Sequence, residues 1–282
     1  MDITELKKRL DAAGLHPSKD RGQNFLLDEG VLIDMLKAAQ VTSNDCIVEV
    51  GPGFGVLTEQ LAKQAKQVLA MELDHGLARE LNNQFLPKHK NVTLFEGDAL
   101  SKAAYQAKIA WLNGQPYKVV ANLPYQITSK LLRDLMESEP KPQSITVMVQ
   151  KEVAMRATAK AGDMSLLALS IQAYSQASLV RIVSAKAFFP KPEVDSAVLH
   201  CDLTKPNAEY AALNDQQRDQ FWKLARLGFS SRRKQLKNNL AKPLGRSADD
   251  IQAIFAKIGI TPLARAQELT IEQWCSLTKA IA

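Results

Sequence analysis

The sequence predicts an α/β protein with a mostly parallel sheet, followed by a small all-helical C-terminal domain. Short β-rich runs alternate with helical patterns as far as Leu203, a glycine-rich loop follows the first buried run, and no convincing strand pattern comes later. Strands that alternate with helices favour parallel pairing, with ligands at the carboxyl ends of the strands. We therefore predict two domains, residues 1–204 and residues 205–282.

The elements of the first domain follow from the spacing of its apolar residues. A short helix at 3–14 precedes a polar loop at 16–28. The patterns then predict helices at 29–40, 56–65, 75–85, 129–138, 151–160 and 164–175, and strands at 46–50, 67–73, 117–123 and 144–150, with one more strand and its exit loop within 91–100. Runs at 178–184 and 197–203 close the pattern, and we expect them to form an antiparallel edge pair.

The last quarter of the chain carries the excess of positive charge. Residues 1–204 hold 23 Lys and Arg against 23 Asp and Glu, whereas residues 205–282 hold 13 against 7. After a linker at 205–210, helices are expected at 214–228, 230–241, 247–257 and 270–281. A basic module beside a neutral one suggests a polyanionic partner, and an idle basic surface is the alternative.

Composition excludes several classes of protein. With 46% hydrophobic and 23% charged residues, the chain has an ordinary globular composition. Cys46, Cys201 and Cys275 are far apart, so we predict neither disulfides nor a metal site. The N-terminus lacks the apolar stretch of a signal peptide, and no apolar run is long enough to span a bilayer. We expect a cytoplasmic protein with reduced cysteines and no membrane partner.

The first candidate site motif is a Gly-x-Gly-x-Gly loop that runs from Gly51 to Gly55 between a strand and a helix. Glycines let the backbone approach a ligand without Cβ clashes. Glu72 ends the next strand, where a carboxylate can accept hydrogen bonds from ribose hydroxyls, and Asp98 follows the third, where it can accept from an adenine amine. Each acid alone fits a solvated strand end, but the three features together predict a nucleoside pocket.

The second motif, Asn122-Leu123-Pro124-Tyr125, ends the fourth strand. The lone pair of an adenine amine is delocalised into the ring, so the amine is a poor nucleophile. The Asn122 amide oxygen and a backbone carbonyl held by Pro124 can accept its two N–H bonds and free the lone pair for attack on a sulfonium methyl. Tyr125 offers a ring face to an extruded base. The alternative is an ordinary Asn-x-Pro turn.

A third stretch, AFFPKPEVDSAV at 187–198, places two aromatic residues beside prolines. Such a stiff loop could stack on the other face of the base. A loop packed into the core is the alternative.

Together these motifs resemble the ribosomal RNA adenine dimethyltransferase family, most closely its small-subunit branch. The resemblance covers nearly the whole chain and rests on Glu72 and on residues 22–28, 49–58, 97–100, 122–125, 188–198 and 229–240. It implies a Rossmann-like S-adenosylmethionine-dependent methyltransferase fold. The cofactor contacts that it implies are Asn24, Leu26, Gly51, Gly53, Glu72, Asp98, Ala99 and Asn122.

The resemblance also implies roles for these residues. Asn24 and Leu26 would form a lid over the methionine end of the cofactor. Tyr125 and Phe188 would sandwich the target base; Phe188 is the match because the family pattern is Phe-x-Pro-x-Pro, in which Phe189 takes the second position. The implied catalytic group is Asn122, Leu123, Pro124, Tyr125 and Phe188.

The implied reaction transfers two methyl groups to N6 of each of two adjacent adenines in the loop of the last helix of 16S ribosomal RNA. The substrate would be an assembling 30S particle, bound by a monomer with a role in ribosome maturation. Arg232 and Arg233 match an arginine pair of the family, and with Lys234 and Lys237 they form a basic cluster. We expect this cluster to contact RNA phosphates, with Arg233 and Lys237 on one helix face. An ion pair between Arg232 and an acid of the first domain is the alternative.

Three other functions fit part of the sequence. The antibiotic-resistance methyltransferases of 23S RNA share every site motif, but the length of the basic helical quarter favours the small-subunit enzyme. A binding or assembly factor with a vestigial site is disfavoured by the intact Glu72, Asp98 and 122–125 set. A nicotinamide oxidoreductase is disfavoured because the glycine spacing is not Gly-x-Gly-x-x-Gly.

Overall fold

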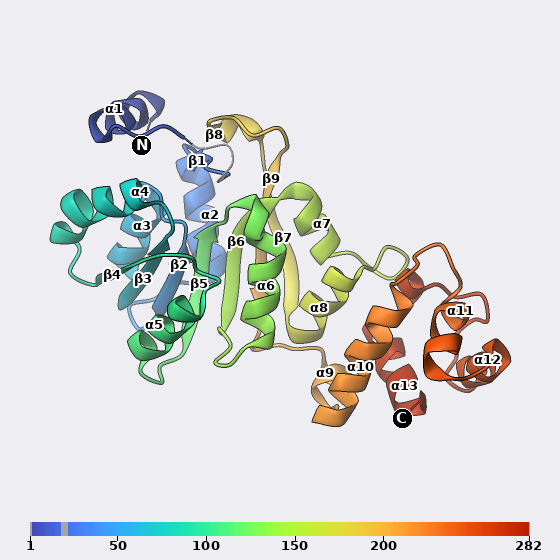
Figure 1. Cartoon of the computed structure of the whole chain (residues 1–282). Coiled ribbons are helices and arrows are strands. Elements are labelled where there is room, and N and C mark those ends of the chain that lie inside the picture. The colour runs from blue at the N-terminus through green and yellow to red at the C-terminus, as the bar shows by residue number, and fades with distance from the viewer. Residues whose placement is uncertain (1, 18–21, 282) are drawn as a thin grey trace. The chain divides into compact units, whose positions relative to one another are not determined.

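The computed structural model describes residues 2–17 and 22–281, and the chain divides into two compact units (Figure 1). Unit 1 comprises residues 1–154 and 178–203, and unit 2 comprises residues 155–177 and 204–282. The second unit therefore resumes at Thr204, next to the boundary that the sequence predicts.

Residues 155–177 depart from the predicted division, because we expected them in the first domain. Met164, Leu169 and Ala173 belong to the same buried apolar cluster as Leu224 and Trp274 of unit 2. Their long-range packing, which local periodicity does not reveal, places them with the second unit.

The sheet of unit 1 has the strand order β4-β3-β2-β5-β6-β9-β7 (Figure 1). Neighbours from β4 to β6 are parallel, and β9 runs antiparallel to β6. This confirms the mostly parallel α/β sheet. The strands are β2 (Cys46–Val50), β3 (Gln67–Glu72), β4 (Val92–Glu96), β5 (Tyr117–Asn122), β6 (Ser144–Gln150), β7 (Gln176–Val183) and β9 (Ser196–Asp202).

Helices pack on both faces of this sheet. One face is covered by α2 and α3, whose apolar residues share a buried cluster with alternate strand residues such as Ile47, Val120 and Met148. In Figure 1, α5 and α6 lie on the face toward the viewer. The helices of this part of the chain are α1 (Ile3–Ala13), α2 (Glu29–Ala39), α3 (Val56–Gln64), α4 (His75–Glu80), α5 (Lys102–Leu112), α6 (Thr128–Glu137) and α7 (Lys151–Ala157).

The sequence analysis did not predict α5. Its buried residues are Ala104, Lys108 and Leu112, so a lysine occupies a position on the inner face and the apolar stripe is hard to recognise. Lys108 is accommodated because its Nζ donates to the Tyr117 hydroxyl at 3.1 Å and lies 5.1 Å from the Tyr117 ring centroid.

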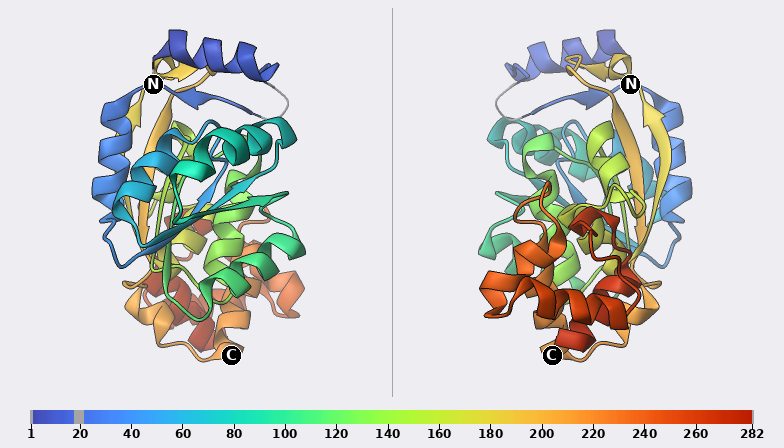
Figure 2. Two further views of the ribbon diagram at one scale, coloured as in Figure 1. Left: turned by 90° about the vertical axis from the view of Figure 1, so that its left-hand side faces the viewer. Right: turned by 90° about the vertical axis from the view of Figure 1, so that its right-hand side faces the viewer.

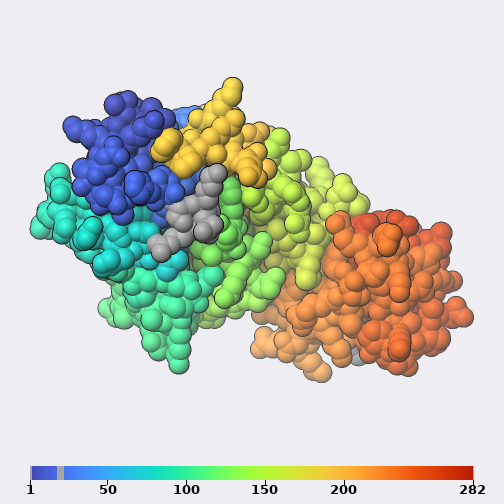
Figure 3. Space-filling view, turned by 45° about the horizontal axis from the view of Figure 1, so that its top comes forward, coloured from blue at the N-terminus to red at the C-terminus, as the bar shows by residue number. Residues whose placement is uncertain are grey.

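A second, two-stranded sheet joins distant parts of unit 1. In it β1 (Phe25–Leu26) runs antiparallel to β8 (Phe188–Phe189), with Phe25 opposite Phe189 and Leu26 opposite Phe188. Helix α1 packs against this sheet, and the Lys7 Nζ lies 5.3 Å from the Phe189 ring centroid. Figures 2 and 3 show α1 beside the β8 segment. Strands of two residues carry no recognisable pattern, so the sequence could not predict this pairing.

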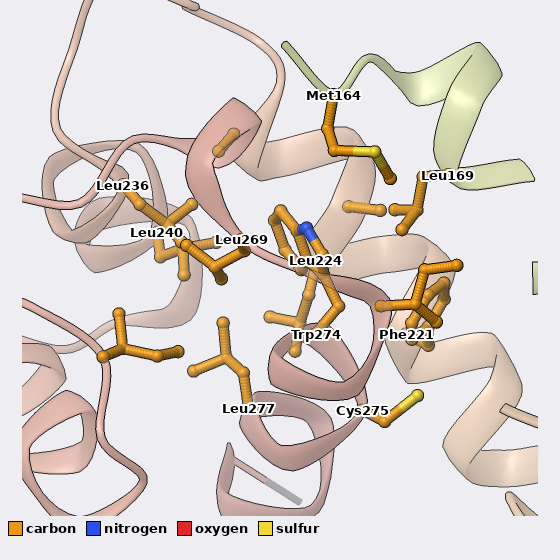
Figure 4. Close-up of a cluster of buried hydrophobic side chains, with 14 of the residues drawn as sticks. Met164, Leu169, Phe221, Leu224, Leu236, Leu240, Leu269, Trp274, Cys275 and Leu277 are labelled. Carbon is orange, nitrogen blue, oxygen red and sulfur yellow. The ribbon is translucent and has the colours of Figure 1, made fainter. Parts of the chain in front are cut away.

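Unit 2 is helical and packs around Trp274, Phe221 and Leu224 (Figure 4). It contains no strand of its own from Thr204 to Ile281, which agrees with the predicted helical region. Its helices are α8 (Leu166–Tyr174), α9 (Ala208–Ala211), α10 (Asp215–Gly228), α11 (Leu236–Ala241), α12 (Ala248–Lys257) and α13 (Ile271–Ile281). Helix α9 lies where we expected a linker.

The expected helix at 230–241 is wrong in its first half, because α11 begins only at Leu236. The Asn239 Nδ2 donates to the carbonyl oxygens of Gly228 at 2.7 Å and Ser231 at 3.0 Å. These bonds satisfy the last carbonyl of α10 and one carbonyl of the following segment, and they hold residues 229–235 in a turn.

Candidate active site

The carboxyl ends of β2, β3, β4 and β5 surround a cavity of about 280 Å³. The cavity wall contains every residue that the sequence suggested for the cofactor, together with Leu123, Pro124 and Tyr125. The wall is formed by residues 22–26, 49–54, 71–74, 97–99 and 122–127, with Leu32, Val56, Leu57 and Leu77. Five separate segments of unit 1 therefore converge on one site.

The glycine loop lies close to the other walls of the cavity. Gly51 has a φ of 72° and Gly53 a φ of 58°, in the left-handed region that glycine adopts without strain. A Cβ at Gly51 would lie 3.5 Å from the Pro124 ring, and one at Gly53 would lie 3.2 Å from the Phe25 ring. The loop thus leaves space between β2 and β5 that a side chain would occupy.

The Glu72 carboxylate is held in place by the backbone. Its Oε2 accepts the Gly53 N–H at 3.1 Å, and its Oε1 accepts the Asp74 N–H at 2.8 Å. Burial raises the pKa of Glu72, and these two hydrogen bonds partly offset that effect. Each oxygen retains a further lone pair, so the side chain can accept two hydroxyl groups from a ligand.

Glu49 is a cavity residue that the sequence analysis missed. Its side chain is 1% exposed, and its Oε2 has no hydrogen-bond partner among the described residues. Burial raises the pKa of Glu49 to about 8, with Thr58 opposing and the Glu72 charge adding to the effect. The available signal was an acid inside an apolar strand, directly before the glycine loop.

Asp98 and Leu73 are exposed residues of the cavity wall. The Asp98 side chain is exposed, and its Oδ1 accepts the Leu100 N–H at 2.8 Å. Leu73, which sequence reasoning also missed, is 61% exposed although it lines the cavity. An exposed leucine beside a fixed acceptor suits a flat aromatic ligand with a polar edge.

Asn122 joins the end of β5 to the segment that contains Asn24. Its Nδ2 donates to the Asn24 carbonyl oxygen at 3.2 Å, so the amide oxygen is the atom oriented to accept from a ligand. The Pro124 carbonyl accepts from the Thr128 Oγ1 at 3.2 Å and the Ile127 N–H at 3.3 Å. With Pro124 engaged, the preceding Leu123 carbonyl is the natural second acceptor.

The two aromatic residues of the expected sandwich differ in position. Tyr125 is half-buried and lines the cavity, and its hydroxyl lies 2.7 Å from the Ser196 Oγ. Phe188 is 4% exposed and is absent from the described cavity wall. Its pairing with Leu26 in the β1–β8 sheet places it in the cluster beneath α2, as in the core-packed alternative. Stacking of Phe188 on a base stays a prediction.

The basic cluster of unit 2 also differs from expectation. Arg232, Arg233 and Lys234 are exposed, but they lie in the turn before α11 and not on a helix. Lys237 is half-buried, and its Nζ donates to the Gln252 Oε1 at 2.5 Å. The prediction that Arg233 and Lys237 share one helical face is therefore wrong. The exposed charges of this cluster are Arg232, Arg233 and Lys234, which lie in the turn.

Two kinds of site are absent from the described residues. Residues 2–17 and 22–281 include no helix with the length and apolar character that a bilayer span requires. In the same part of the chain, no three His, Cys, Asp or Glu side chains gather as metal ligands would.

Comparison with known proteins gives matches along nearly the whole chain. A family model described as ribosomal RNA adenine dimethylase matches residues 16–282. A Dehalococcoides mccartyi protein named ribosomal RNA small subunit methyltransferase A is 43% identical over 274 residues, covering 96% of this chain and 91% of that protein. A Leuconostoc citreum protein of the same name is 37% identical over 284 residues, covering 99% and 94%.

Two solved structures share the fold. A dimethyladenosine transferase from Plasmodium falciparum has a TM-score of 0.73 at 24% identity, covering 90% of this chain and 95% of that one. The 23S rRNA methyltransferase ErmE has a TM-score of 0.70 at 24% identity, covering 92% and 99%. These similarities confirm the predicted methyltransferase fold.

Proposed function

The chain belongs to the ribosomal RNA adenine dimethylase family, and from that premise we propose that it dimethylates N6 of two adjacent adenines in 16S ribosomal RNA. The family and the enzyme class predicted from the motifs, an S-adenosylmethionine-dependent adenine dimethyltransferase, are confirmed. The target we propose is the loop of the last 16S helix, within the 30S subunit or its precursor. We propose that the enzyme acts there as a cytoplasmic monomer during ribosome maturation.

The cavity fits the cofactor that the family uses. Gly51 and Gly53 leave room for close approach to the backbone, the fixed Glu72 carboxylate suits ribose hydroxyls, and Asp98 beside Leu73 suits an adenine. Asn24 and Leu26 also line the cavity, and we assign them to the methionine end of the cofactor. S-adenosylmethionine, when bound, supplies an electrophilic sulfonium methyl group.

The observation that carries the proposal is the orientation of Asn122. Because its Nδ2 is engaged by the Asn24 carbonyl, its Oδ1 can accept one N–H of a target amine, and the Leu123 carbonyl can accept the other. These acceptors hold the nitrogen near tetrahedral geometry, with its lone pair free to attack. The Tyr125 ring supports the base. Its hydroxyl is neutral at pH 7, as in an ordinary tyrosine, and burial raises its pKa further, so it is not a base for the proton released from nitrogen. We propose that this proton passes to water.

The experiment is methyl transfer from labelled cofactor to purified, unmethylated 30S subunits, followed by mapping of the modified nucleotides. We expect label in two adjacent adenines of the last 16S helix. Purified 50S precursors and the Asn122→Ala variant serve as controls. Label in 23S RNA would identify the other branch of the family, and absence of label on either particle would favour an assembly factor.

A further inference from the structure

The Tyr125 ring is anchored at its far end by a residue from another part of unit 1. Tyr125 begins a short 3-10 turn, Tyr125–Ile127, after β5. Its hydroxyl lies 2.7 Å from the Oγ of Ser196, the first residue of β9. Ser196 is 0% exposed and is not among the described residues of the cavity wall. The hydroxyl end of the ring is therefore held in the sheet, while the ring itself borders the cavity.

Ser196 is itself fixed by backbone contacts. It pairs with Gln150 in the β6–β9 ladder. The preceding residue, Asp195, accepts the Lys151 N–H on its carbonyl oxygen at 2.9 Å and the Ala185 N–H on its Oδ1 at 3.0 Å. The anchor therefore belongs to a rigid strand, whereas Tyr125 belongs to a short turn.

The hydroxyl bond does not prepare Tyr125 for proton transfer. A tyrosine hydroxyl is ordinarily neutral at physiological pH, burial raises the Tyr125 pKa further, and its oxygen is already paired with a buried serine. What the bond does fix is the direction of the ring axis, because the hydroxyl oxygen lies at one end of that axis and the Cβ at the other.

We propose that Ser196 is a positioning residue for methyl transfer, which holds the Tyr125 ring in the position on which the target adenine stacks. This inference rests on the proposed function. With the bond intact, the ring is ordered before the base arrives. Without it, the ring must be ordered at each encounter, and the base reaches the attacking position less often.

The test compares Ser196→Ala, Tyr125→Phe and the double variant, which remove the same bond from either side or both. Thr146→Val is the matched control, because Thr146 is equally buried and its hydroxyl bonds His200 between β6 and β9 at 2.8 Å without contacting Tyr125. Single-turnover methylation of 30S subunits is measured at saturating cofactor. Stacking is followed by fluorescence of 2-aminopurine placed at one target adenine, and cofactor affinity by calorimetry.

We expect each single variant to lose about 3- to 10-fold in rate, from the ordering cost of one side chain. The double variant should lose no more than either single variant, and 2-aminopurine quenching should weaken equally in all three. Thr146→Val should keep the parental rate and quenching, and cofactor affinity should be unchanged throughout.

A parental rate in Ser196→Ala, or losses that multiply in the double variant, would overturn the inference while leaving the proposed function intact. If Ser196→Ala lowers the melting temperature more than the control does, Tyr125→Phe decides, since it keeps Ser196 and the ring. A parental protein that does not label 30S subunits would overturn both proposals.

Discussion

The Asn122 side chain has two roles, which two measurements on one variant can separate. Asn122→Ala removes the Oδ1 that we assign to the target amine, and it also removes the Nδ2 bond to the Asn24 carbonyl. The first loss acts on the chemical step. The second loosens the segment of Asn24 and Leu26, which lines the same cavity.

The two losses have different sizes. A preorganised polar group that acts in the transition state contributes a factor of about 10² to 10³ in rate. A neutral hydrogen bond such as the 3.2 Å contact to Asn24 contributes about 1 kcal/mol, or about 5-fold in cofactor affinity. We therefore expect Asn122→Ala to reduce the rate far more than it weakens cofactor binding.

Asn122→Asp distinguishes acceptor from donor. The carboxylate keeps an oxygen for the amine, but it cannot donate to Asn24 and places two acceptor oxygens against each other. We expect this variant to retain more of the single-turnover rate than Asn122→Ala at saturating cofactor. Its cofactor affinity should fall at least as far.

The assay is single-turnover methylation of 30S subunits at saturating cofactor, with cofactor affinity by calorimetry and 30S affinity by filter binding. Both affinities act as controls, because they separate binding from chemistry. If Asn122→Ala transfers methyl groups at the parental rate, Asn122 is only a turn residue and the assigned mechanism is wrong.

Three further predictions follow from the described contacts. Glu72→Ala should weaken cofactor binding by about 1.5–3 kcal/mol in calorimetry without changing 30S affinity. Glu96→Ala, at the exposed end of the next strand, is the control and should change neither the cofactor affinity nor the 30S affinity. If the two variants bind the cofactor equally well, Glu72 does not bind the ribose. Because the Glu49 pKa is raised to about 8 from 4.5, the folded cofactor-free protein keeps a proton that the unfolded chain releases, so its unfolding free energy should fall across that pH window by up to about 1.4 kcal/mol per unit. Denaturant titrations of Glu49→Gln should show a flatter dependence on pH, and an unchanged one would contradict the buried neutral acid. Neutralising residues 232–234 should reduce the slope of log affinity for 30S subunits against log salt concentration by about one unit per lost phosphate contact. Lys237→Gln is the control and should leave that slope unchanged. A slope that changes only in Lys237→Gln would refute the assignment of the phosphate contacts to residues 232–234.

The predicted site residues that the structure brings together in one cavity wall are those that lie at a strand end. Glu72, Asp98 and Asn122 each follow a recognisable apolar run, and parallel strands bring their carboxyl ends to one edge. The positions of the strands along the sequence could be predicted because each strand is such an apolar run.

Features that depend on distant packing were not predictable. Phe188 is covered because β8 pairs with β1, and the two strands come from opposite ends of the unit 1 sequence. The bond between Tyr125 and Ser196 likewise joins residues that are far apart in the sequence, so no local pattern predicts it. Arg233 and Lys237 fit one helix face by spacing alone, but Asn239 holds the preceding segment in a turn.

The β1–β8 pairing bears on how often the site must open. Two methyl groups on each of two adenines require four molecules of cofactor, so under the proposed function the segment of Asn24 and Leu26 must release spent cofactor repeatedly for one RNA. The contacts that hold that segment include a ladder only two residues long, the Leu27 N–H bond to the Ala187 carbonyl at 2.8 Å, the Asn122 bond and a 3.3 Å contact from the Gln23 Nε2 to the Asp74 Oδ2. A neutral bond of this kind contributes about 1 kcal/mol and a bond to a carboxylate about 1.5–3 kcal/mol, so release can break these local contacts and leave the large sheet intact. The brevity of β1 and β8 thus suits an enzyme that completes several transfers on one substrate.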